Sequence, residues 1–346
     1  MQGNIDLGKA KRGLLIVILL GVLAITVIIA LTFNKRTLGA LAKIDITFLF
    51  LAILAMILSW VFSALPFYIL TRVVKQPISF ASSLFVYLGG SFFGLVTPFG
   101  SGLIPAQVFI LTGNRLSPGQ AAAVTGSRAT ISSWLFVLLG AAIFLAFGSS
   151  LSSSAKAGIL GIAIAATVWS LIILFFIKLP EKAKSAVDGI FNNRLVVRIF
   201  GRDRLGKAKT RINSEIDYLN LSLKDLFSYS NVPAILTSFL SEVTAWLAIF
   251  SVLPLILFGF GVRSNFAQLV FRLFLLFSVA PASPVPGGSG LVEGALVALL
   301  SGLVPTIIKG VIVLIWRLLT YYLTLLVGGI VVLRLVARSA HGNQTR

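Results

Sequence analysis

The chain has 346 residues, of which 58% are hydrophobic and 11% are charged, and its formal net charge is +19. Soluble domains carry about 25% charged residues, so this composition predicts an integral membrane protein. There is no cysteine, which excludes disulfides and thiolate metal sites, and the single histidine is His341 near the C-terminus. Most hydrolase and metal-centre arrangements are therefore excluded.

Six uninterrupted apolar stretches have the length of a transmembrane helix, which needs about 20 residues. They are residues 13–33, 46–71, 121–147, 158–177, 231–258 and 310–333. The first lacks a small-residue cleavage site and is longer than the apolar region of a signal peptide, so we expect it to be retained. Two further apolar stretches, 80–112 and 266–306, are interrupted near their centres by proline and glycine.

The distribution of lysine and arginine predicts the sidedness of a multi-pass protein of the cell membrane. Basic residues gather in the N-terminal tail, in segment 178–230 and in the C-terminal tail, which places all three in the cytoplasm. Counting crossings from there, 80–112 starts and ends inside, whereas 266–306 starts and ends outside. Nucleic-acid binding, the rival explanation for a basic chain, is disfavoured because the charge lies on loops between spans.

Each interrupted stretch is therefore interpreted as a re-entrant hairpin. Arms of about 15 residues reach about 22 Å into a hydrocarbon core that is about 30 Å thick. Two short but complete spans in each stretch satisfy the same count of crossings and remain the alternative.

An internal repeat supports the paired hairpins. A shift of 188 residues, the separation of Pro98 from Pro286, aligns "TPFGSG" (97–102) with "VPGGSG" (285–290) and brings Arg128 near Arg317. Because the two copies start from opposite faces, we predict inverted repeats over 46–147 and 231–335. Paired interrupted segments in inverted halves indicate the binding site of a transporter.

The basic segment 178–230 is predicted to be a cytoplasmic loop that contains an amphipathic helix. Its apolar residues recur at a spacing of 4-3-4-3, which is one stripe of a helix; they are Ile212, Ile216, Leu219, Leu223 and Leu226. This helix either lies on the inner leaflet or packs onto the cytoplasmic ends of the spans.

Charged residues inside apolar segments are the candidate functional groups, because a charge at the bilayer centre costs at least about 2.5–3.5 kcal/mol. They are Glu242, Glu293, Arg128, Arg272 and Arg317. Glu242 either carries a proton or pairs with Arg272 or Arg128. Arg272 lies near the end of its stretch and is expected to extend to the membrane surface.

The break at Gly287, Gly288 and Gly290 is the strongest candidate for a binding site. A half-helix is expected to begin near Gly290, and its unpaired N–H groups and positive dipole end favour an anion such as a lipid phosphate. Glu293, in its first turn, either handles substrate or protons, or is stabilised by the helix start and by pairing with Arg317. The guanidinium of Arg317 suits bidentate binding of phosphate.

These residues lie in segments that resemble a known family. "PVPGGSGLVEGALVALLSGLVP" (284–305) and "WRLLTYYLTLLVGG" (316–329) resemble the signature of the lysylphosphatidylglycerol synthase/flippase transmembrane-domain family, and "GGSFFGLVTPFGSG" (89–102) resembles its first-half motif. The resemblance implies translocation of a lipid between leaflets. One departure is that residues 103–107, "LIPAQ", replace the family's usual Gly-Glu-x-x-Arg run.

The sequence thus predicts an all-α polytopic membrane protein, with two inverted repeats and two re-entrant hairpins, that transports a lipid. The lipid is a phospholipid, an aminoacylated phospholipid or a polyprenyl-phosphate lipid. In this hypothesis Arg317 and Arg128 hold the phosphate, the start of the half-helix adds amide donors, and Glu293 is the ionisable switch. The alternative is a proton- or ion-coupled secondary transporter of a small solute.

No enzymatic activity and no cofactor are expected, because the intramembrane segments contain no histidine, cysteine or clustered acids to supply a nucleophile or a metal site. The expected partners are membrane lipids with anionic or polar headgroups and a separate lipid-synthesising enzyme. Nucleic acid is not an expected partner, and a homo-oligomer is left open.

Overall fold

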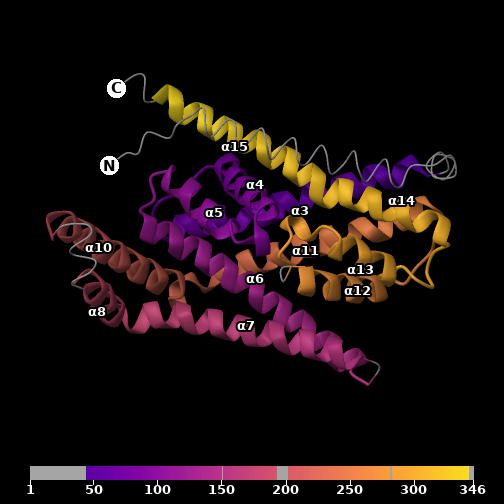
Figure 1. The fold of residues 1–346 in the computed structure, drawn as a ribbon, viewed down its shortest axis with the longest axis horizontal. Coiled ribbons are helices and arrows are strands. Elements are labelled where there is room, and N and C mark those ends of the chain that lie inside the picture. Colours follow the sequence, from indigo (N-terminus) through magenta and orange to yellow (C-terminus); the bar gives the residue numbers. More distant parts are fainter. Residues whose placement is uncertain (1–43, 150, 193–201, 281–282, 343–346) are drawn as a thin grey trace. The chain divides into compact units, whose positions relative to one another are not determined.

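A computed structural model describes residues 44–149, 151–192, 202–280 and 283–342, and this part of the chain is helical and contains no strand. The predicted span 13–33 lies outside the described residues. Figure 1 shows the helices in chain order. The fold is that of a polytopic all-α membrane protein, as the sequence predicts.

Five of the described helices are long and apolar enough to span a membrane, and they match the five predicted spans beyond residue 43. They include α3 (Ile46–Val73), α6 (Pro118–Phe147) and α11 (Val232–Gly259), together with most of α7 (Ser153–Lys178). The last span runs from Ile308 to Ala337 and covers three consecutive elements, which are α14 (Thr306–Arg317), the π-helical turn η5 (Leu318–Tyr322) and α15 (Leu323–Gly342).

The chain forms two compact units. Unit 1 comprises the described residues up to Val61, then Tyr87–Ala106, and those from Thr244 onward. Unit 2 comprises Phe62–Val86 and Gln107–Val243. Four helices, among them α3 and α11, pass from one unit into the other, and each unit is described here by itself.

In unit 2, α6 and α7 run side by side, and α8 (Pro180–Phe191) and α10 (Arg202–Leu226) pack at one end of the pair. The helix α10 is the predicted amphipathic helix of segment 178–230. It packs directly on α6, where a Cβ atom at Gly119 would lie 2.2 Å from the backbone oxygen of Glu215. Leu223 and Leu226 are accordingly fully buried. The sequence left open whether this helix lies on the inner leaflet or packs onto the spans, and within unit 2 it packs onto the spans.

Both interrupted stretches consist of a helix, a short turn and a second helix, and both turns belong to unit 1. The first is α4 (Phe80–Val96), the turn η1 (Pro98–Gly100) and α5 (Leu103–Thr112). The second is α12 (Phe266–Val279), the turn η4 (Pro286–Gly288) and α13 (Leu291–Leu299). The arms after the breaks have 10 and 9 residues, so they extend only about 15 and 14 Å. They are shorter than predicted because the turns themselves take up several residues.

The second stretch folds back on itself. The helices α12 and α13 lie against each other, and Arg272 near the start of α12 donates a hydrogen bond to the carbonyl of Leu299 at the end of α13. The two arms are therefore antiparallel. That such a hairpin enters and leaves a membrane by the same face stays a prediction.

The two turns have nearly the same backbone conformation at positions 188 residues apart. Phe99 has φ 57° and ψ 13°, and Gly287 has φ 62° and ψ 10°. The next residues, Gly100 and Gly288, have φ 65° and 66°. The same shift relates the starts of α5 and α13 and the starts of α6 and α14. This agreement is consistent with the predicted internal repeat. The repeat and its inverted topology both stay predictions.

Candidate functional site

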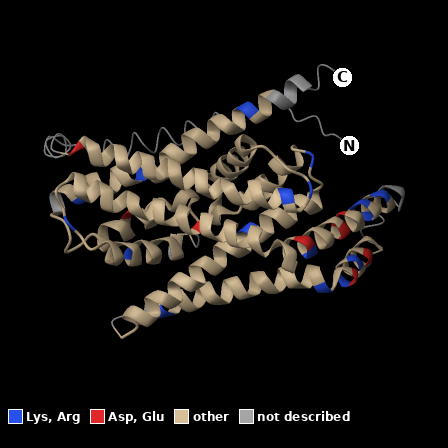
Figure 2. Ribbon diagram, turned by 180° about the vertical axis from the view of Figure 1, so that it is seen from behind, with Lys and Arg blue, Asp and Glu red and all other residues tan. Residues whose placement is uncertain are grey.

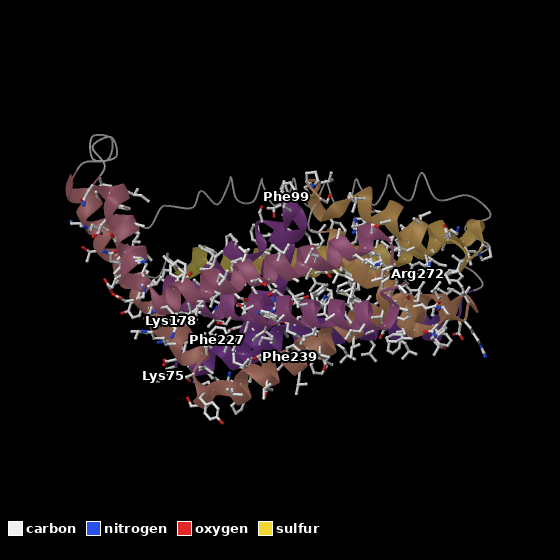
Figure 3. The ribbon with its side chains drawn as sticks, turned by 90° about the horizontal axis from the view of Figure 1, so that it is seen from below. Lys75, Phe99, Lys178, Phe227, Phe239 and Arg272 are labelled. Carbon is white, nitrogen blue, oxygen red and sulfur yellow. The ribbon has the colours of Figure 1, made fainter. Side chains whose placement is uncertain are left out.

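The turns of the two broken stretches lie against each other in unit 1. The N–H group of Phe99 donates a hydrogen bond of 3.1 Å to the carbonyl of Ser283, just before η4. Phe99, which Figure 3 labels, is 59% exposed and adopts the left-handed backbone conformation that costs a non-glycine residue about 1–2 kcal/mol. Strain of this kind gathers at functional sites.

Arg317 bonds to residues on both sides of the second break. Its Nε donates to Oε1 of Glu293 at 2.7 Å, and its Nη2 donates to the carbonyl of Gly287 at 3.0 Å. The other carboxylate oxygen of Glu293 accepts the N–H of Gly290 at 2.7 Å, at the start of α13. One side chain thus links the turn, the half-helix and α14.

Tyr321 is placed over the same turn by the π-helical turn that follows Arg317. A Cβ atom at Gly287 would lie only 2.1 Å from the ring of Tyr321, so the ring rests directly on the glycine. The guanidinium carbon of Arg317 lies 4.5 Å from the centre of this ring. π-Helical turns are rare and are often found at functional sites.

A cavity of about 390 Å³ lies in unit 1 where these elements meet. Its wall includes residues of both breaks, among them Phe99, Gly100, Gly287 and Gly288, together with Arg317. This volume is within the range of about 300–1,000 Å³ that is usual for small-molecule sites. Arg317 donates two of its five N–H groups to Glu293 and to the carbonyl of Gly287. The other N–H groups are left as donors for an anionic group.

Trp316 also lines this cavity, and its indole Nε1 is buried with no hydrogen-bond partner among the described residues. A buried donor without a partner costs about 1–3 kcal/mol. A polar group or a water molecule reaching this indole would remove that cost.

A second intramembrane ion pair lies in unit 2. Nη2 of Arg128 on α6 lies 2.8 Å from Oε1 of Glu242 on α11, and the Glu242 side chain is 1% exposed. The guanidinium carbon of Arg128 also lies 5.1 Å from the ring centre of Phe67. Of the two partners that the sequence left open for Glu242, the structure selects Arg128.

Comparison with known proteins identifies the family of this chain. A family model described as "Lysylphosphatidylglycerol synthase TM region" matches residues 16–328. The chain belongs to this family. A UPF0104 membrane protein of Archaeoglobus fulgidus is 25% identical over 315 residues, which cover 90% of this chain and 94% of that protein.

The structure brings some of the predicted site residues together and leaves others apart. Gly287, Gly288 and Arg317 line the cavity in unit 1. Glu293 and Gly290 reach it only through hydrogen bonds, and Pro98 and Pro286 begin the two turns. Arg128 and Glu242 belong to unit 2.

Arg272 is half-buried and donates a hydrogen bond to the carbonyl of Leu299 at the end of α13. The physical reason is that the final carbonyls of a helix have no partner within the helix, and a nearby arginine satisfies them. Its extension to a membrane surface stays a prediction.

Sequence reasoning missed three residues of the site: Ser283, Trp316 and Tyr321. Trp316 and Tyr321 stand in the segment "WRLLTYY" beside Arg317. The paired glycines were the signal, because a backbone position without a side chain indicates close approach by a neighbouring group. Here that neighbour is the ring of Tyr321.

Proposed function

We propose that this membrane protein moves a lipid with an anionic or polar headgroup between leaflets, and that it acts as a transporter without enzymatic activity. The observation that carries the proposal is the cavity of about 390 Å³ whose wall contains both helix breaks and Arg317. Membership of the lysylphosphatidylglycerol synthase TM family supports a lipid substrate. A phospholipid, an aminoacylated phospholipid or a polyprenyl-phosphate lipid has the required headgroup.

In this proposal the headgroup enters the cavity while the acyl chains stay in the surrounding lipid. The phosphate accepts hydrogen bonds from the N–H groups of Arg317 that have no partner among the described residues. Glu293 stays bound to the same guanidinium. Protonation of Glu293 weakens its hold on Arg317 and frees that arginine for the phosphate. A charged headgroup crosses the bilayer without paying the full cost of leaving water, because Arg317 offsets its charge.

The proposal places the protein in the cell membrane with both termini in the cytoplasm, on the basis of its basic tails and its basic segment 178–230. The lipid is made by a separate enzyme. Arg128 corresponds to Arg317 in the predicted repeat, and it pairs with Glu242 on α11. In this proposal the pair keeps its two buried charges neutral.

The test is leaflet exchange in proteoliposomes with fluorescent phosphatidylglycerol, its aminoacylated form and a polyprenyl-phosphate lipid. Protein-free liposomes give the background rate, and each lipid is assayed with and without an imposed proton gradient. Faster exchange of at least one lipid with the protein is the expected result. If no lipid moves under any gradient, the proposal is wrong, and coupled transport of a small solute becomes the better account.

A further inference from the structure

A second, larger cavity lies wholly within unit 2 and shares no residue with the cavity at the breaks. It measures about 660 Å³ and lies between the start of α6, the end of α7, and the helices α8 and α10. Its wall is apolar over most of its area, with Ala122, Phe176, Ala186 and Ile216 among its residues. Its volume is within the usual range for a bound ligand.

The cavity opens where a membrane-spanning helix meets charged helices. The apolar span of α7 ends at Lys178, which Figure 3 labels, and α8 begins directly after it at Pro180. The helix α8 carries lysines and acids beside the apolar side chains that face the cavity. Such a helix is typical of the boundary between hydrocarbon and headgroups.

The walls are fixed by hydrogen bonds between helices. Nδ2 of Asn220 on α10 donates to the carbonyls of Phe176 and Ile177 at 2.6 and 2.9 Å, at the end of α7. Oε2 of Glu215 accepts the N–H of Gly119 at 2.8 Å, at the start of α6. The cavity is therefore part of the packed arrangement of α6, α7 and α10.

Figure 2 shows charged residues gathered on α8 and α10 and few on the long helices α6 and α7. Two of the lysines are paired with acids: Lys184 lies 2.6 Å from Asp217, and Lys209 lies 3.1 Å from Asp188.

Arg211 and Lys182 are exposed and make no ion pair within the described ranges. Arg211 also lines the cavity. The acid on the same wall, Glu215, is already engaged by the N–H at the positive end of α6, which offsets part of its charge. Among the described residues, Arg211 thus places an unpaired positive charge on the wall of an apolar cavity, and Lys182 lies on α8, one of the helices that form this wall.

We infer that this cavity binds an acyl chain of an anionic phospholipid, with the headgroup phosphate against Arg211 and near Lys182. An acyl chain gains little by leaving one apolar environment for another, because lipid tails are as apolar as the cavity wall. Preference among lipids therefore comes from the headgroup, and an anionic lipid is favoured over a zwitterionic one. The site does not depend on the proposed transport.

The test uses the full-length protein in detergent micelles with a trace of phosphatidylglycerol that carries a photoreactive group on one acyl chain. Cross-linked peptides are identified by mass spectrometry, and phosphatidylglycerol and phosphatidylcholine are compared as competitors. The variants are Arg211→Gln, the double variant with Lys182→Gln, and Ala186→Trp to fill the cavity. Lys156→Gln, which removes an exposed lysine near the other end of α7, is the matched control.

We expect cross-links in the ends of α6 and α7 and in α8 and α10, with phosphatidylglycerol the stronger competitor. Arg211→Gln lowers that preference about fivefold, and Lys182→Gln lowers it about fivefold again. Ala186→Trp abolishes the cross-link, and Lys156→Gln changes nothing. Equal competition by phosphatidylcholine, cross-links elsewhere, or a preference that Arg211→Gln leaves unchanged would each overturn the inference. Arg211 is exposed, so its substitution leaves the folded protein in place for this measurement.

Discussion

Replacing Gly287 by alanine tests whether the second break is held in the conformation described. The residue has a φ of +62°, and a Cβ atom there would lie 2.1 and 2.5 Å from two ring carbons of Tyr321 and 2.6 Å from its hydroxyl oxygen. The left-handed conformation costs alanine about 1–2 kcal/mol, and the overlap with the ring adds about 1–3 kcal/mol. We therefore expect Gly287→Ala to destabilise the protein by about 2–5 kcal/mol.

Gly261→Ala is the matched control, because Gly261 has a φ of +72° and open space around its missing Cβ. It should lose only about 1–2 kcal/mol, the cost of the backbone conformation. Equilibrium unfolding in mixed detergent micelles measures both variants. A double-mutant cycle adds Tyr321→Ala, which removes the ring.

In the Tyr321→Ala background, Gly287→Ala should cost no more than the Gly261→Ala control costs. The remaining difference between the two glycine variants is then the steric overlap with the ring. If Gly287→Ala costs the same with and without the Tyr321 ring, the close contact on which the site is built does not exist.

Three further substitutions test the other contacts in the same unfolding assay. Glu293→Gln removes a charged hydrogen-bond partner of a buried arginine and should cost about 1.5–3 kcal/mol. Glu242→Gln leaves Arg128 without its counter-charge and should cost about 3–5 kcal/mol, part of which Arg128→Gln restores. Gly119→Ala forces α10 away from α6, so amide hydrogen exchange along α10 should speed up, whereas Gly158→Ala, with open space around it, should leave exchange unchanged.

Each of these has a contradicting outcome. A Glu293→Gln protein as stable as the parent would mean that the pair with Arg317 contributes nothing. Costs that simply add for the two partners of the unit 2 ion pair would mean that those residues do not interact. Unchanged exchange in Gly119→Ala would contradict the close packing of α10 on α6.

The spans and breaks were predictable because they depend on local sequence. The length of an apolar run decides whether a helix can cross a membrane, and "PVPGGSG" cannot continue a helix. The start of α13 beside Glu293 also follows from local rules, since an acid in the first turn caps the free N–H groups. Its pairing with Arg317 was one of two alternatives that the sequence left open.

The remaining features depend on tertiary packing. The sequence offers Glu242 both Arg128 and Arg272, and the choice rests on which helices face each other. Nothing local indicates that Phe99 takes the conformation that glycine takes at position 287. The π-helical turn that brings Tyr321 over Gly287 likewise leaves no mark in the apolar pattern of the span.

The most direct test of the headgroup site uses phosphatidylglycerol that carries a photoreactive group on its headgroup, reconstituted with the protein in nanodiscs. The account predicts cross-links to residues that line the cavity, on α4, on the turn η4 and on α14. It also predicts that Ser91→Trp, which fills the cavity, abolishes them, whereas Ser251→Trp on α11, outside the cavity wall, does not. Cross-links that persist in Ser91→Trp, or that fall only on the outer faces of the spans, would contradict a headgroup site at the breaks.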